Sequence, residues 1–165
     1  MATAHLHDDP SRTTPRGLIR YASEFYAAGE AADKALGEWP GYEIHAPVPV
    51  MFLMAQSIEL SLKAFLLSSG VTLPTLRSKK FGHRLSACLK EAQARDLAKI
   101  IALLPDDQSV IAVVDDLYSS KQLQYMVIGM KTFPSYGPLQ AVALKLLEGI
   151  AAHVGYPPYR LPHAL

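Results

Sequence analysis

The sequence predicts an all-α protein, a helical bundle of four to six helices with one short extended or irregular segment near 122–134. Across most of the chain, apolar residues recur at intervals of three and four, the period of a helix with one buried side. Glycine and proline separate these stretches from one another. The run 122–134 differs because it contains β-branched and aromatic residues and alternates weakly. A bundle therefore fits the sequence better than a sheet.

Length, composition and charge limit the domain and its partners. The chain has 165 residues, half of them hydrophobic and 19% charged, which suits one domain with a sizeable core. We assign residues 15–165 to a single helical domain and residues 1–14, which are polar and interrupted by proline, to a flexible tail. The net charge of +1 argues against a protein that coats DNA, so an anion site must be local.

The sequence also argues against several kinds of site. Cys88 is the only cysteine, so we expect neither an internal disulfide nor a zinc site of several cysteines, and its apolar surroundings predict a buried thiol. A glycine-rich phosphate loop, a GxSxG motif and an HExxH motif are all missing. We expect no metal and no cofactor. The lack of a signal-peptide pattern, and an apolar stretch that ends at Gln56 before the ~20 residues of a membrane span, predict a cytoplasmic protein without membrane contact.

The first helix is expected to begin after Pro15, since proline is tolerated in a first helical turn, and to end near Leu36. Its inward positions are mostly small, which allows a second helix to approach closely. They are Leu18, Ala22, Phe25, Gly29, Ala32 and Leu36. A loop follows over 37–49, where two glycines and three prolines interrupt the pattern.

The second helix, about 50–69, is predicted to be the centre of the bundle because it is apolar on most sides. Three arcs of its surface are apolar or small: Met51, Met54, Ile58, Leu62 and Phe65; Ser57, Ser61, Ala64 and Ser68; and Leu53, Leu60 and Leu67. The polar stripe Gln56, Glu59 and Lys63 should face a partner or a site. Glu59 precedes Lys63 by four residues, the favourable order for a helical ion pair. Gly70 is the expected helix stop.

Three further helices are expected. One begins near His83 and breaks or bends at 94–96, because two successive apolar faces are rotated against each other by roughly a quarter turn. These faces are Leu85, Cys88, Leu89 and Ala92, and then Leu97, Ile100, Ile101 and Leu104, with Pro105 at the end. The next helix, 106–120, contains two acidic pairs, Asp106–Asp107 and Asp115–Asp116, which we interpret as a solvated face. The last helix spans about 138–154.

Two stretches carry a recognisable pattern. One is E-L-S-L-K-A-F-L-L-S-S-G, from Glu59 to Gly70, and the other is K-x-F-G-H-x-L-x-x-x-L-x-x-A, from Lys79 to Ala92. Together they resemble HEPN domains, small helical domains that occur beside nucleotidyltransferases and in prokaryotic conflict systems such as toxin–antitoxin pairs. The resemblance covers about 51–92, roughly a quarter of the chain. It implies a helical bundle that is either a non-catalytic module or a metal-independent ribonuclease.

The ribonucleases of this family carry R-x(4–6)-H, and two copies of the motif meet across a dimer. Arg77 and His83 satisfy this spacing. By this resemblance His83 would act as general acid or base, and Arg77 would hold the scissile phosphate by a bidentate contact. Ser78 departs from the Asn, Asp or His common after the arginine, and the G-H pair opens a middle helix, whereas the nuclease motif sits late in its bundle. The ribonuclease toxin is therefore the alternative interpretation.

Two other interpretations of the same residues stay open. In one, His83 is structural and hydrogen-bonds to the second helix, where Glu59 is the obvious partner. In the other, free N–H groups at the helix start form a nucleotide- or anion-binding site with nearby cations. The residues of that site are Arg77, Lys79, Lys80, Gly82 and His83. We expect a HEPN-like module that is non-catalytic, binds a nucleotide, RNA or a protein partner, and forms a homodimer.

Overall fold

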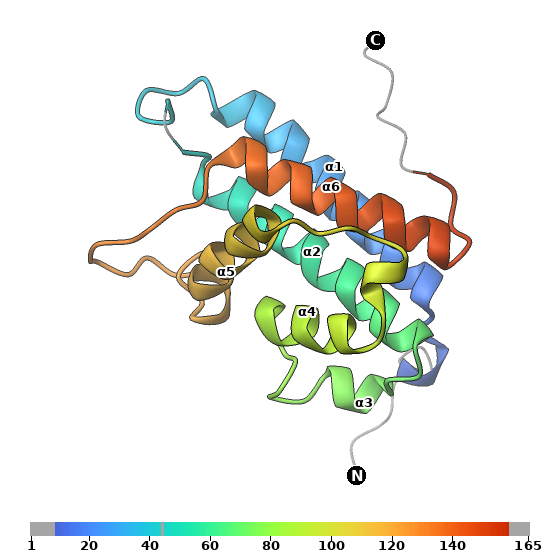
Figure 1. Ribbon diagram of the computed structural model, residues 1–165. Helices are drawn as coiled ribbons and strands as arrows, with labels where there is room; N and C mark the ends of the chain where they lie inside the picture. The colour runs from blue at the N-terminus through green and yellow to red at the C-terminus, as the bar shows by residue number, and fades with distance from the viewer. Residues whose placement is uncertain (1–8, 44, 159–165) are drawn as a thin grey trace.

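The computed structural model describes residues 9–43 and 45–158, and over these residues it is helical without a strand, which confirms the predicted fold class (Figure 1). The six α-helices are α1 (Pro15–Leu36), α2 (Val48–Ser68), α3 (Leu73–Leu76), α4 (Leu85–Ala94), α5 (Pro105–Ser119) and α6 (Tyr136–His153). Two 3₁₀ turns, η1 (Pro10–Arg12) and η2 (Leu97–Lys99), complete the elements. Of the expected tail, residues 1–8 lie outside the described part of the chain.

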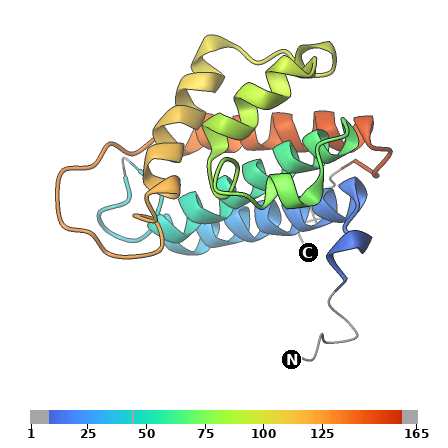
Figure 2. The ribbon, with the colours of Figure 1, turned by 90° about the horizontal axis from the view of Figure 1, so that it is seen from below.

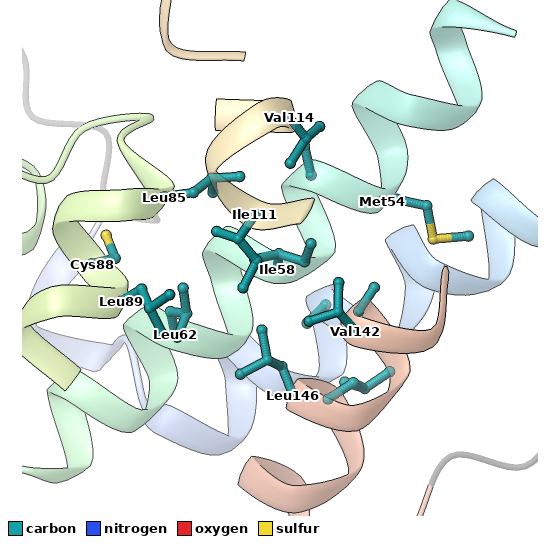
Figure 3. Close-up of a cluster of buried hydrophobic side chains, with 14 of the residues drawn as sticks. Met54, Ile58, Leu62, Leu85, Cys88, Leu89, Ile111, Val114, Val142 and Leu146 are labelled. Carbon is teal, nitrogen blue, oxygen red and sulfur yellow. The ribbon is translucent and has the colours of Figure 1, made fainter. Parts of the chain in front are cut away.

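Helix α2 is the centre of the bundle, because it packs against each of the other five α-helices. Helices α1 and α4 lie on opposite sides of α2, as Figures 1 and 2 both show, and α6 packs against both α1 and α2. The predicted apolar arc of α2 is fully or almost fully buried. Figure 3 shows Met54, Ile58 and Leu62 of this arc among side chains of α4, α5 and α6.

The small-residue arc of α2 explains the close approach of α1. Ser57 is buried, and its hydroxyl donates to the backbone carbonyl of Ala22 in α1 at 2.8 Å. Ser61 and Ala64 are also buried, whereas Ser68 at the end of the helix is exposed. The buried face of α1 differs from the expected one. Ala22 and Gly29 are buried as predicted, but Ile19 and Tyr26 are buried in place of Leu18 and Phe25. The centre of the buried face is therefore rotated by roughly 60°, less than one residue position on a helix of 3.6 residues per turn.

Gly70 ends α2 as predicted. It lies at φ 87°, the N–H of Gly70 donates to Leu67, and the N–H of Val71 donates to Leu66. These two bonds satisfy carbonyl groups at the end of the helix, the pattern of a Schellman motif. Glycine is suited to this position because a side chain at positive φ is strained.

The region after Gly70 departs most from expectation. The short helix α3 was not predicted, and α4 begins at Leu85 rather than near His83. The predicted break at 94–96 is confirmed, since α4 ends at Ala94 and Asp96 has φ 66°. Beyond it only η2 forms, and Pro105 begins α5 instead of ending the preceding helix. The segment 120–135 carries neither helix nor strand, which agrees with the irregular connection that was expected.

Helix α2 also bears on the expectation of no membrane contact. Among the described residues it is the one helix long and apolar enough to cross a membrane, with a mean hydropathy of 1.6. The expectation that its apolar stretch is too short is therefore wrong. However, 67% of that apolar window is buried against the rest of the bundle, as in the core helix of a globular domain, and one such helix is weak evidence for a span.

Candidate functional site

The polar stripe of α2 faces the interior of the chain. Glu59 is 2% exposed, and its carboxylate lies against the turn before α4 and against α5. The Lys63 side chain is 14% exposed, so both charges are largely removed from water. The stripe therefore faces other elements of the same chain.

Both oxygens of Glu59 are used. Lys63 Nζ donates to Oε1 at 2.5 Å, the ion pair that the sequence predicts. The second oxygen, Oε2, accepts from His83 Nδ1 at 3.0 Å and from the Tyr118 hydroxyl at 2.5 Å. Tyr118 also contacts the side-chain amide of Gln56. A phenol has one proton to donate, and a carboxylate is a stronger acceptor than an amide oxygen. We therefore assign the Tyr118 O–H to the hydrogen bond with Glu59, and orient the Gln56 amide so that its NH₂ group donates to the phenol oxygen.

The charges in this cluster determine its protonation states. Burial acts to raise the pKa of Glu59, but the charge of Lys63 and the hydrogen bonds from Lys63 and Tyr118 outweigh burial, so the net pKa is lowered. Burial and then the negative charge of Glu59 raise the pKa of Tyr118, which keeps the phenol protonated. Burial also raises the pKa of Cys88 to about 12, which agrees with the predicted inert, buried thiol.

His83 lies at the edge of this cluster, and the predicted contact with Glu59 is present. The side chain is 54% exposed, and its ring meets the Tyr118 ring edge-on at 5.7 Å. Since Nδ1 donates to a carboxylate, the proton of the neutral ring is assigned to Nδ1. The other nitrogen, Nε2, has no hydrogen-bond partner among the described residues. The backbone of His83 has φ 53°, an uncommon conformation for a residue with a side chain.

The start of α4 is not a free anion site. The N–H groups of Leu85 and Ser86 donate to the two carboxylate oxygens of Asp115, at 2.8 and 3.0 Å. The N–H of Gly82 donates to the carbonyl of Ser78. The expectation of free N–H groups is wrong here because a carboxylate from α5 already supplies the negative charge that a helix start favours.

The acidic pairs of α5 are therefore only partly solvated. Asp106 and Asp116 are exposed as predicted, while Asp115 caps α4. Asp107 accepts the N–H of Leu104 at 2.8 Å and pairs with Lys145 of α6 at 2.6 Å. Neighbouring residues on a helix point in different directions, and the inner member of each pair meets another element.

The cations of the predicted anion site are on the surface. Arg77 follows α3 directly, and its side chain forms no hydrogen bond or ion pair with any described residue. Lys80 pairs with Glu91 of α4 at 3.5 Å, and its Nζ lies 4.6 Å from the centre of the Phe81 ring. The turn therefore folds back along α4. Over 77–95 the chain contains six lysines and arginines, all exposed, and one carboxylate.

Two clefts formed by described residues lie away from the Glu59 cluster. The larger, about 510 Å³, is lined by the end of α1, the loop after it and the start of α6, and the smaller, about 310 Å³, by residues 9–21. Neither includes Arg77 or His83. No cluster of described residues has the composition of a metal site.

Sequence reasoning missed Tyr118 and Asp115 as partners of the site. Tyr118 fits the apolar helical pattern of 106–120, which predicts a core position and says nothing of its hydroxyl, and the pattern predicts a solvated Asp115. A buried tyrosine needs a partner for its hydroxyl, and this rule is the one available signal for Tyr118. No local spacing connects Asp115 with Leu85, since the two are 30 residues apart.

The comparisons with known proteins identify no relative. No protein-family model matches the chain, and neither a curated protein nor a solved structure matches it.

Proposed function

We propose that the chain is a non-catalytic HEPN-like helical module that binds RNA through its phosphate backbone and acts as a homodimer. The charge of segment 77–95 carries the RNA part of this proposal. This segment contains six cations and one carboxylate, whereas the rest of the chain contains ten cations and fourteen carboxylates. Cations that neutralise phosphates supply affinity that does not depend on base sequence.

The side chains of this segment favour phosphates over bases as the contact. Arg77, Lys79, Arg84 and Lys90 are exposed and take part in no ion pair among the described residues, so they are available to a polyanion. Phe81, the one aromatic residue of the segment other than His83, is 1% exposed and offers no surface for base stacking. Binding should therefore be strongly salt-dependent and tolerant of sequence.

The surroundings of His83 favour binding over catalysis. Its Nδ1 is engaged by Glu59, which is already paired with Lys63, and within the chain the Arg77 side chain forms no hydrogen bond with His83. Cleavage of the ribonuclease type requires the arginine and histidine to meet at one scissile phosphate. The alternative, a metal-independent ribonuclease, is tested by incubating the same RNA with the protein in EDTA and measuring cleavage.

The test is binding of a labelled mixed-sequence RNA of about 20 nucleotides, measured by anisotropy over a series of salt concentrations. The charge-reversal variant K79E/R84E/K90E removes three cations of the segment. Its matched control, R16E/K34E/K121E, makes the same change in net charge at exposed, unpaired positions elsewhere. We expect the first to lower affinity at least tenfold and to reduce the salt slope by about 2, and the control to keep the slope.

Several outcomes contradict the proposal. Equal losses in the two variants would show that only net charge matters, and no binding at low salt would remove RNA as a ligand. Tighter binding of a polyglutamate peptide than of RNA would indicate an acidic protein partner. RNA that is cut in EDTA by the wild type, but not by H83A, would establish the ribonuclease.

A further inference from the structure

The exposed hydrophobic residues of this protein are concentrated in one short segment. Of the eight large hydrophobic side chains that are exposed in the described part of the chain, five lie within 125–130. Met126, Ile128 and Met130 are 94%, 91% and 104% exposed. Single exposed hydrophobic residues are normal, but a continuous run of them marks an interaction surface.

Segment 125–130 is anchored by the residues on either side of it, but most of its backbone forms no hydrogen bond with any described residue. Leu123 before it is buried, and Phe133 after it stacks on His45 with ring centres 5.1 Å apart. Between these anchors it extends away from the bundle, at the same end as the α1–α2 loop (Figures 1 and 2). The backbone of 126–134 forms no hydrogen bond with any described residue. Its polar groups and its apolar side chains are thus both available to a partner.

The pattern of side chains in the segment is self-complementary. Met126 and Met130 are equidistant from Ile128, so two copies that cross antiparallel at Ile128 would place each Met126 beside the partner copy's Met130. No charged residue lies between Lys121 and Lys131. In this arrangement Lys131 falls opposite Tyr125 and not opposite a second lysine, which avoids repulsion between like charges.

We propose that segment 125–130 is the dimer interface and that its occupant is the same segment of a second copy, related by a two-fold axis at Ile128. A two-fold interface pairs a surface patch with itself, which is the property of this segment. The proposal concerns side-chain contacts and not a regular ladder, because the chain bends at Gly129, where φ is 146°. It names the surface of the dimer in the proposed function and does not depend on RNA binding.

Sedimentation equilibrium on the full chain tests this interface. We expect the wild type to dimerise at micromolar concentration, and both I128K and I128E to weaken the dimer at least tenfold, because two like charges meet at the axis. An equimolar mixture of I128K and I128E should restore dimers. Ile128 is exposed, so these variants should fold normally, which circular dichroism and urea unfolding verify. The control L104K changes a hydrophobic side chain that is 61% exposed at the start of α5 and should dimerise like the wild type.

The outcomes separate this inference from its rivals. A monomeric wild type, or I128K that dimerises like the wild type, overturns it. A mixture of I128K and I128E that stays monomeric overturns the two-fold position at Ile128. A monomer that binds phosphatidylserine vesicles, and loses that binding in I128E, would assign the segment to a lipid surface instead. RNA binding that fails while the dimer persists would remove only the RNA proposal.

Discussion

Replacing Lys63 by methionine should destabilise the fold far more than the loss of an ordinary helical ion pair. Methionine preserves most of the length and apolar contact of the lysine stem, so the change removes mainly the charge. At an Nζ–Oε1 distance of 2.5 Å, the attraction between unit charges is about 7 kcal/mol at an effective dielectric constant of ~20. Most of it offsets the cost of removing the two groups from water.

The net loss follows from what remains around Glu59. Breaking a buried pair by removing one partner costs about 3–5 kcal/mol, because the other charge stays buried without compensation. We expect about 3 kcal/mol for K63M, the lower end, because Lys63 is 14% exposed and the contacts from His83 and Tyr118 persist. The pair Arg20–Glu24 has the same spacing but side chains 64% and 58% exposed, so R20M should cost at most about 0.5 kcal/mol.

The dependence on pH has a definite sign. In the wild type the pKa of Glu59 is lowered from 4.5, so its stabilising contribution is present above pH 4.5 and is lost as the pH falls below that value. In K63M the main influence that lowers this pKa is gone and burial acts to raise it. The variant is then penalised at neutral pH and relieved as Glu59 takes up a proton. The difference in unfolding free energy between wild type and K63M should therefore shrink as the pH falls from 7 toward 4.

Urea unfolding, followed by circular dichroism and by tyrosine fluorescence, measures these differences. The double variant E59Q/K63M removes both charges and should recover much of the stability lost in K63M, since no buried charge remains without a partner. A K63M loss under about 1 kcal/mol, or one equal to that of R20M, would refute the reasoning. So would a difference that grows as the pH falls.

Three further predictions concern other parts of the bundle. D115N should cost about 1–2 kcal/mol in urea unfolding by weakening the cap on α4, whereas the exposed neighbour D116N should cost under about 0.5 kcal/mol. G149A should cost about 1–3 kcal/mol, because its Cβ would lie 2.5 Å from Cγ1 of Ile101, and G149A/I101A should be more stable than the two single losses add up to. Cys88, which is 0% exposed, should react with a thiol reagent only at the rate of unfolding; fast reaction of the native protein would contradict its burial.

The elements that the sequence predicts well are those with a dense local pattern. Helix α2 is apolar on most sides, so its arcs, its stop at Gly70 and the pair Glu59–Lys63 all follow from spacing within one helix. Helix α1 has apolar residues on both sides of its inner face, so the spacing fits Leu18 and Phe25 as well as it fits Ile19 and Tyr26, the residues that are buried. Helix α3 has four residues, too few to show a helical period.

The site was predictable only where it used local relationships. The contact of His83 with Glu59 followed from a polar stripe on an otherwise apolar helix, since a buried carboxylate needs partners. The third partner, Tyr118, comes from α5, and its role depends on how α5 crosses α2. The capping of α4 by Asp115 has the same origin. Three-dimensional packing, and not spacing along the chain, brings these groups together.

The buried charges and the exposed cations belong to one arrangement. His83 occupies φ 53°, a conformation that costs of order 1–3 kcal/mol and persists only where surrounding contacts offset that cost, and Glu59 supplies such a contact. Two residues later, Asp115 fixes the first N–H groups of α4. Each end of the junction between the turn and α4 is thus tied to a carboxylate from a packed helix. Because the cations of 77–84 lie on this turn, the two carboxylates determine where the positive surface faces, although neither is part of that surface.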